Sequence, residues 1–273
     1  MTRPSASSAS AAGSGPGTAA AGGPVSVRVW DLPTRLFHWV LVLLIAGLWW
    51  TGTSGTLPLG PLAGASILGW TVPTGQMAQH MLMGYAVLTL VIWRLLYGLV
   101  GSSTSRFAGF VRGPAAVIAY LRGALGGGEK AAAPAVLGHN PAGGWMILVL
   151  LAVLAAQATT GLFSNDDIFT DGPLVRLVSK ETSDSLTGWH KNILFPSLLA
   201  LIALHVAAAL FYLAVKRDNL IRAMVTGRKT LPAAAGTTAV GTDGRQVRFA
   251  SPLVAVAALA VAVTVVWAVV TQL

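Results

Sequence analysis

Residues Gly188–Arg217 read GWHKNILFPSLLALIALHVAAALFYLAVKR, a stretch that is long and apolar enough to cross a membrane as one helix. His190 and His205 lie fifteen residues apart within it. Over that interval an α-helix rises about 22 Å and makes four turns plus about 60°, so both imidazoles leave roughly the same face at different depths. Pro196 lies between them and can kink the helix, which loosens the angle. Because ionisable side chains are costly inside a bilayer and are usually functional there, we interpret this helix as one side of a stack of two buried cofactors.

The overall composition places the chain with multi-pass membrane proteins. Hydrophobic residues make up 54% of it, charged residues only 10%, and the mean hydropathy is +0.69. The absence of cysteine excludes disulfides, iron–sulfur clusters with thiolate ligands, zinc–thiolate sites and thioether-attached haem. A net charge of +9 is compatible with nucleic acid, but the basic residues border apolar spans, which is the pattern that records membrane orientation. We therefore predict no nucleic-acid partner.

Five apolar spans predict an all-α integral membrane protein, with a four-helix transmembrane bundle and a fifth, C-terminal transmembrane helix. Residues 1–24 are rich in Ala, Ser, Gly and Pro and lack the apolar core of a signal peptide, so a disordered tail is expected there. The bundle is expected over residues 27–230 and a linker over residues 231–250. The expected spans are residues 36–52, 76–100, 145–163, 188–215 and 251–271.

The positive charges sort the connections between the spans onto two sides. The N-terminal segment, the connection between spans two and three, and the connection between spans four and five hold 15 of the 18 Lys and Arg residues. The positive-inside rule places these three segments in the cytoplasm. We therefore predict a protein of the bacterial inner membrane with a cytoplasmic N-terminus and a periplasmic C-terminus.

This orientation sorts four of the five histidines by depth into two pairs. His80 and His190 are expected near the outer side, and His38 and His205 towards the cytoplasmic side. Each pair joins a residue of span one or two to a residue of span four. Two imidazoles that face one another across a helix bundle are the ligand set of a six-coordinate haem b, which needs no cysteine. The pattern predicts two non-covalent haems b with these four histidines as iron ligands.

Other polar and small residues are interpreted around this pair scheme. Arg94 lies fourteen residues after His80 on nearly the same helix face. Arg94 and Arg35 are candidates for pairing with propionates of the cytoplasmic haem, and a snorkelling interfacial arginine is the rival interpretation of Arg94. Gly84 could let a flat ring lie close to the helix, but taken alone it is better interpreted as a helix-packing contact. His139, in a Gly-His-Asn-Pro turn, is expected at the surface or beside the ligands rather than as a ligand.

Other kinds of site fit this pattern less well. A histidine-based proton relay or transporter would normally add carboxylates, and the five spans contain no Asp or Glu, so it stays a distant alternative. A non-haem metal centre would bring histidines at i, i+3 or i+4, or an HExxH motif, and neither occurs. Met77, Met81 and Met83 flank His80 and offer a histidine–methionine haem in principle, but methionine is ordinary filling in apolar helices.

The order and spacing of four motifs resemble the bacterial cytochrome b561 family, which includes the b-type cytochrome subunits of nickel–iron hydrogenases. They are RVWDLPTRLFHW (Arg28–Trp39), WRLLYGLVGSSTSRFAGFVRGP (Trp93–Pro114), GHNPAGG (Gly138–Gly144) and the pair His190 and His205. The resemblance covers residues 27–230 and implies a diheme membrane cytochrome that exchanges electrons with the quinone pool. It also implies ligands from spans one, two and four, at the same four histidines. The low-complexity tail and the fifth span depart from the pattern.

The expected function is respiratory electron transfer across the membrane, between the quinone pool and a redox partner. A hydrogenase, another dehydrogenase or a cytochrome c would be such a partner. The alternative is a stand-alone quinone oxidoreductase that uses a small oxidant such as superoxide. Quinone is expected to dock beside the cytoplasmic haem, because Trp39 and Arg35 lie next to His38 at the membrane border.

Overall fold

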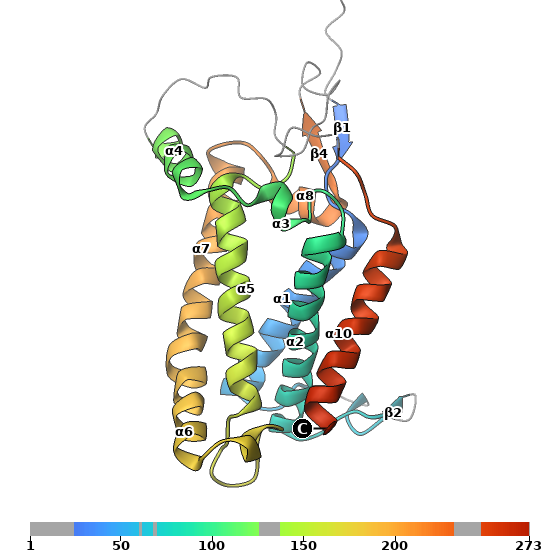
Figure 1. Ribbon diagram of the computed structural model, residues 1–273, viewed down its shortest axis with the longest axis vertical. Coiled ribbons are helices and arrows are strands. Elements are labelled where there is room, and N and C mark those ends of the chain that lie inside the picture. The colour runs from blue at the N-terminus through green and yellow to red at the C-terminus, as the bar shows by residue number, and fades with distance from the viewer. Residues whose placement is uncertain (1–24, 60–61, 68–69, 126–136, 232–246, 273) are drawn as a thin grey trace, which may run out of the picture.

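The computed structural model describes residues 25–59, 62–67, 70–125, 137–231 and 247–272, so the expected tail and most of the expected linker lie outside the described residues. Within these ranges, five helices are long and apolar enough to cross a membrane. They run side by side (Figure 1), which confirms the predicted all-α membrane fold. They are α1 (Leu32–Thr53), α2 (Gln76–Val100), α5 (Pro141–Leu162), the continuous helix formed by α6 (Lys180–Gly188), η3 (Trp189–Leu194) and α7 (Phe195–Ala214), and α10 (Pro252–Gln272).

Two helices begin earlier than the apolar pattern predicts because polar side chains cap them. The carboxylate of Asp31 accepts a hydrogen bond from the backbone N–H of Thr34 at 2.9 Å, which starts α1 before residue 36. The side chain of Asn140 accepts from the N–H of Gly143 at 2.7 Å and starts α5 before residue 145. Each cap is followed by a proline in the first turn, where no intrahelical N–H is needed.

The fourth membrane helix starts at Lys180 rather than near residue 188, and it contains a π-helical turn, η3. The backbone N–H of Phe195 bonds to the carbonyl of His190, five residues back. Pro196 follows directly, and it has no N–H to donate and a ring that crowds the carbonyl four residues before it. A wider turn accommodates that mismatch. The rotation between His190 and His205 therefore differs from the 60° of an ideal helix.

Helix α10 lies outside the four-helix bundle and packs along α2 (Figure 1). Ala255, Ala258 and Ala262 form a strip of small residues against Trp93 and Tyr97. The indole N–H of Trp93 donates to the carbonyl of Ala255 at 2.9 Å. Small residues let membrane helices approach closely. The fifth helix thus adds to the bundle from outside, as the predicted four-plus-one arrangement requires.

The two ends of the bundle are built differently (Figure 1). At one end, which we call the capped end, strand β1 pairs antiparallel with β4, α8 contacts β4, α3 follows α2, and α4 packs on α5 at the other side of the bundle. These elements are β1 (Val25–Arg28), β4 (Arg228–Leu231), α3 (Phe107–Phe110), α4 (Pro114–Leu125) and α8 (Leu220–Thr226). The opposite end, the loop end, carries the hairpin of β2 (Ser66–Ile67) and β3 (Trp70–Thr71) and the α5–α6 connection with η2 (Val175–Leu177).

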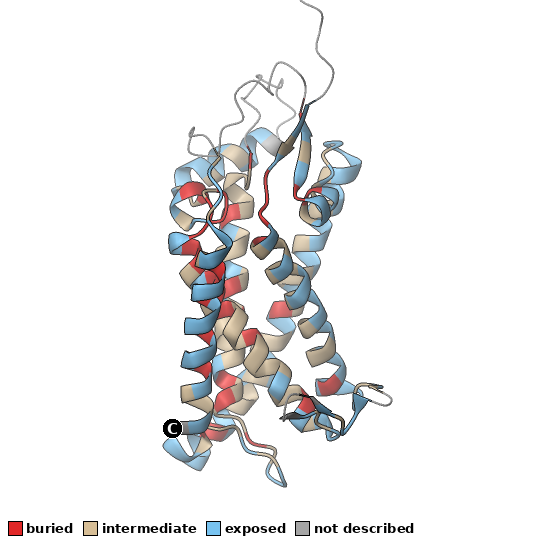
Figure 2. Ribbon diagram, turned by 90° about the vertical axis from the view of Figure 1, so that its right-hand side faces the viewer, coloured by how far each residue is buried: buried red, intermediate tan, exposed pale blue. Residues whose placement is uncertain are grey.

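The pairing of β1 with β4 places the N-terminal segment and the connection between spans four and five at the same end, as the charge count predicts. Many large apolar side chains of the long helices are exposed on the outer faces (Figure 2), as a lipid-facing surface requires. Exposed tryptophans lie near both ends, in the manner of interfacial aromatic belts. They are Trp39 and Trp145 towards the capped end and Trp49, Trp50, Trp189 and Trp267 towards the loop end.

Candidate cofactor site

The structure brings the four predicted ligand histidines together as two pairs inside the bundle. His80 on α2 faces His190 in η3 towards the loop end, with ring centroids 6.4 Å apart. His38 on α1 faces His205 on α7 towards the capped end, also at 6.4 Å. A buried apolar cluster lies at a depth between the two pairs. It is formed by Val87, Val91, Leu154 and Leu198.

The spacing of both pairs fits a single metal ion held between two imidazoles. A metal–imidazole bond is about 2 Å long and a ring nitrogen lies about 1.1 Å from the ring centre, so a linear nitrogen–metal–nitrogen arrangement puts the centroids about 6.2 Å apart. The observed separation of 6.4 Å agrees with this value in both pairs. The residues present therefore fit two bis-histidine cofactors.

At the loop end, hydrogen bonds orient both imidazoles. The Nδ1 atom of His190 lies 2.9 Å from the backbone carbonyl of Gln157, which can only accept, so Nδ1 carries the proton. The Nδ1 atom of His80 lies 3.1 Å from the hydroxyl of Thr51, and that hydroxyl itself donates to the carbonyl of Gly47 at 2.8 Å. Nδ1 of His80 is therefore also the donor. In both rings this tautomer makes Nε2 the atom that can bind a metal. Nε2 of His190 lies 3.2 Å from the side-chain amide nitrogen of Gln157, a contact that a bound metal would replace.

The same arrangement of Thr followed by Gly supports each of these two imidazoles. Thr51 and Gly52 end α1 beside His80, and Thr160 and Gly161 end α5 beside His190. Each threonine hydroxyl donates to carbonyls one turn back in its own helix and lies 3.1 or 3.3 Å from the histidine Nδ1. A Cβ on Gly52 or Gly161 would lie 3.3 or 3.0 Å from the ring, so each glycine makes room for it.

A cavity of about 440 Å³ opens beside the loop-end pair, within the size range of ligand pockets. Gly84 lines it, and a Cβ there would meet no atom within 4 Å. The interpretation of Gly84 as a helix-packing contact is therefore wrong. Gly84 faces open space one turn from His80, where a flat ligand has room.

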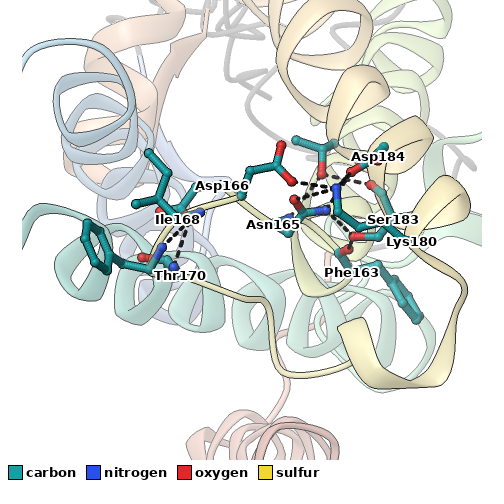
Figure 3. A network of polar contacts seen from close by, with 11 residues as sticks. Phe163, Asn165, Asp166, Ile168, Thr170, Lys180, Ser183 and Asp184 are labelled. Atoms are coloured by element: carbon teal, nitrogen blue, oxygen red, sulfur yellow. Dashed lines mark hydrogen bonds and ion pairs between the residues drawn. The ribbon is translucent and has the colours of Figure 1, made fainter.

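The α5–α6 connection forms the mouth of this cavity. The carboxylate of Asp166 accepts hydrogen bonds from the backbone N–H groups of Thr170, Ile168 and Phe169 at 2.8, 3.0 and 2.9 Å (Figure 3). These three donors hold the pKa of Asp166 below its ordinary value. The side chain of Asn165 joins the connection to α6, so the mouth is an ordered loop with a fixed negative charge.

At the capped end, the polar groups near the histidine pair lack partners. Nδ1 of His38 is buried and has no hydrogen-bond partner among the described residues. The same holds for Nη1 of Arg94, Nε of Arg35 and Nδ1 of His139. An unpaired buried polar atom is unusual in a folded protein and calls for a partner such as a ligand.

Arg94 and Arg35 differ in whether their guanidinium groups already make hydrogen bonds to the protein. Arg94 is only 4% exposed and its guanidinium lies 4.9 Å from the ring centroid of Phe107, so the snorkelling interpretation of Arg94 is wrong. Arg35 donates from Nη1 to the carbonyl of Val225 at 2.6 Å, at the C-terminal end of α8. Arg94 is therefore the freer of the two to meet an anion.

His139 is partly exposed rather than at the open surface, and its Nδ1 atom is buried. Its ring packs between Trp30 and Phe110, with centroid distances of 4.6 Å to each. The pKa of His139 is lowered to about 3, mainly by burial and to a smaller extent by the nearby charges of Arg94 and His205. The remaining expectation, a place beside the ligands, is compatible with this position.

Sequence reasoning missed the residues that orient and make room for the loop-end imidazoles. These are Thr51, Gly52, Gln157, Thr160 and Gly161. A signal was present, because the dipeptide Thr–Gly closes the first and the third span at matching positions. Neither dipeptide stands out alone, since both residue types are common in membrane helices.

The family model described as prokaryotic cytochrome b561 matches residues 29–227, which is more than half of the chain. This range agrees with the predicted resemblance over residues 27–230. No curated protein and no solved structure gives a significant match.

Proposed function

The chain belongs to the prokaryotic cytochrome b561 family, and from this premise we propose that it passes electrons across the membrane through two b-type haems. Membership makes it a membrane b-type cytochrome of electron transfer. The observation that supports the finer proposal is the presence of two histidine pairs, each with a centroid separation of 6.4 Å, at different depths of one bundle. His80 and His190 would hold one haem, and His38 and His205 the other.

The residues of the chain have separable roles in this scheme. Bound haem b supplies a one-electron iron couple. Thr51 and the carbonyl of Gln157 fix the orientation of the loop-end imidazoles, and hydrogen bonds of this kind also make the imidazoles more basic ligands. The apolar cluster around Val87 and Leu198 keeps water out of the interior between the pairs. Arg94 offers a buried positive charge near the capped-end pair.

The quinone pool is the proposed electron partner at the capped end. Trp39 is 37% exposed beside His38, with ring centroids 5.0 Å apart, and its indole N–H lies 3.4 Å from the carbonyl of Met224. This places an aromatic side chain between lipid and the histidine pair. Trp39→Ala should slow reduction of the capped-end haem by quinol while two haems stay bound. Unchanged reduction would remove this docking site.

A redox protein is the proposed partner at the loop end. The mouth of the cavity carries the fixed carboxylate of Asp166, and the α5–α6 region is acidic overall. This charge disfavours an anionic oxidant such as superoxide and favours a partner protein with a basic or neutral docking face. A hydrogenase, another dehydrogenase or a cytochrome c belongs to this class. We also propose that the capped end lies in the cytoplasm of a bacterial cell, because it carries most of the Lys and Arg residues.

The direct test is a haem count on the purified wild-type protein. A pyridine haemochrome assay with a reduced-minus-oxidised spectrum should give two non-covalent haems b per chain. Addition of a quinol should then reduce them. A chain that binds no haem would contradict the proposal and favour the proton-relay alternative.

A further inference from the structure

The proposed function uses four histidines and leaves the fifth, His139, without a role. His139 belongs to the Gly138–Gly144 motif and lies directly before α5. Its ring is held between two aromatic rings, and its Nδ1 atom is buried without a hydrogen-bond partner among the described residues. Such an atom is normally paired with protein, water or a ligand. Nδ1 of His139 therefore has room for a hydrogen-bond partner that the described residues do not supply.

Arg94 lacks a partner in the same place. Its guanidinium lies 6.0 Å from the centroid of Phe110, the ring that also packs against His139 at 4.6 Å. Its Nη1 atom is buried and unpaired, and it forms no salt bridge with a described residue. A guanidinium is always charged, and a buried charge is normally paired with a group of opposite sign. The missing partner of Arg94 is therefore an anion.

The nearest carboxylate of the chain is already engaged with other donors. Asp31 accepts hydrogen bonds from the hydroxyls of Tyr97, at 2.5 Å, and Ser102, and from the backbone N–H of Thr34 at 2.9 Å. Both of its oxygens thus have partners, and none of these is Arg94. Asp31 therefore attracts Arg94 only through its charge, and no described residue supplies an acceptor for Nη1 of Arg94.

Depth along the bundle connects these two donors with the capped-end histidine pair. Arg94 lies six residues before the end of α2, and His38 lies six residues after the start of α1. At 1.5 Å per residue, both are about 9 Å from the capped end of their helices. His139 lies just beyond the start of α5, closer to that end. Arg94 therefore lies at the same depth as the capped-end pair, and His139 lies closer to the capped end of the bundle.

We propose that Arg94 and His139 together bind a carboxylate of the cofactor held between His38 and His205, with His139 donating a ring N–H. This inference rests on the proposed function, because haem b carries two propionate carboxylates. Burial keeps His139 in its neutral form at ordinary pH, so it acts as a hydrogen-bond donor and adds no charge. Arg94 supplies the positive charge that the carboxylate requires.

The test is the midpoint potential of each haem in His139→Leu and in His139→Gln. Loss of the donor leaves more negative charge near the iron, so His139→Leu should lower the potential of the capped-end haem. A fall of 59 mV corresponds to a tenfold change in the one-electron equilibrium. His139→Gln keeps an N–H donor and should restore part of the shift. Arg94→Lys, which keeps the charge but not the fork of donors, should also lower the potential.

Single-haem backgrounds serve as the matched controls. In a His80→Ala background only the capped-end haem should remain, and His139→Leu should lower its potential there. In a His205→Ala background only the loop-end haem should remain, and the same substitution should leave its potential unchanged. Infrared redox difference spectra should show a shifted carboxylate band in the first background alone.

The outcomes separate this inference from the proposed function. Two haems with an unchanged capped-end potential in His139→Leu would overturn the inference and leave the proposed function intact. An equal shift of both haems would also overturn it, because a general packing defect would explain that result. Where His139→Leu does not accumulate, Arg94→Lys decides by the same potential measurement. A wild-type chain without haem would contradict the proposed function itself.

Discussion

At the loop end, Nδ1 of both His80 and His190 has a hydrogen-bond partner, whereas at the capped end Nδ1 of His38 is buried and has none among the described residues. The ring separation is 6.4 Å in both pairs. One ligand geometry is thus placed in two different environments. At the loop end, hydrogen bonds act directly on the two ligand histidines. The capped-end pair instead lies near the unpaired donors of Arg94 and His139.

These environments act on an iron couple in opposite directions. A hydrogen bond from Nδ1 makes an imidazole more basic and stabilises the more positive, oxidised iron. A buried positive charge such as that of Arg94 stabilises the reduced iron, which carries less positive charge. We therefore expect the capped-end haem to have the higher midpoint potential. The following predictions test or refine this contrast.

The largest expected effect is the loss of one whole haem. His205→Ala should reduce the count from two haems per chain to one, and His80→Ala should do the same at the other end, because each removes one of two axial ligands. The single-haem proteins should differ in midpoint potential, with the higher value in His80→Ala. A pyridine haemochrome count with a redox titration measures both quantities. Loss of both haems in either variant would mean that the two sites are not independent.

Filling the loop-end cavity should have the next largest effect. Gly84→Leu places a side chain in open space beside His80, so it should expel the loop-end haem in part while the capped-end haem stays. Gly188→Leu is the matched control. A Cβ at Gly188 also meets no atom within 4 Å, but Gly188 does not line the cavity. Equal haem loss in both variants would contradict a cofactor in this cavity.

Removal of one ligand hydrogen bond should change the potential without loss of haem. Thr51→Val keeps the shape of the side chain and removes the acceptor of the His80 Nδ1–H. The loop-end potential should rise by about 20–60 mV, as expected for a hydrogen bond of about 0.5–1.5 kcal/mol. The difference in midpoint potential between the two haems should therefore become smaller. A redox titration in the His205→Ala background measures this shift, and a fall in potential would contradict the proposed role of Thr51.

The histidine pairs could be predicted from the sequence because a membrane helix has a fixed rise and successive spans alternate in direction. Depth then follows from position alone, as it does for His38 and His205. The burial of His139 could not be predicted, because its cover includes Trp30, which lies more than a hundred residues away in the chain. The role of Thr51 could not be predicted for a different reason. Threonine in membrane helices commonly bonds to its own backbone, and only the fold brings His80 to it.

The helix boundaries and the π-turn could be predicted only in part. The apolar pattern ends where side chains become polar, but helices continue to their caps, as α1 does to Asp31. Pro196 indicated a distortion of the fourth helix without giving its form. A kink and a widened turn both relieve the clash of a proline ring. They leave His190 with different rotations about the helix axis, so helix geometry alone gives the depth of its imidazole but not the direction in which the ring faces.

The smallest expected effect concerns the stability of the capped end, which depends on Asp31. Burial opposes the charge of this carboxylate, but hydrogen bonds from Ser102, Thr34 and Tyr97 hold its pKa below the ordinary value. Because the pKa is lower in the folded state, the stabilisation is present above the ordinary pKa near 3.8 and is lost as the pH falls through the folded value. Asp31→Asn removes the charge and weakens the helix cap. It should cost about 1–3 kcal/mol at pH 7.

This change can be measured at one end of the bundle with the other as reference. Thermal loss of the capped-end haem spectrum in the His80→Ala background should occur at lower temperature in Asp31→Asn than in the parent at pH 7. Acidification should narrow this difference, because only the parent has a carboxylate whose stabilising charge is lost. The loop-end haem, in the His205→Ala background, should respond little, because Asp31 caps α1 at the other end of the bundle. An equal loss at both ends would show that Asp31 stabilises the whole bundle. The two ends would then differ in the environments of their histidines but not in how their stability depends on Asp31.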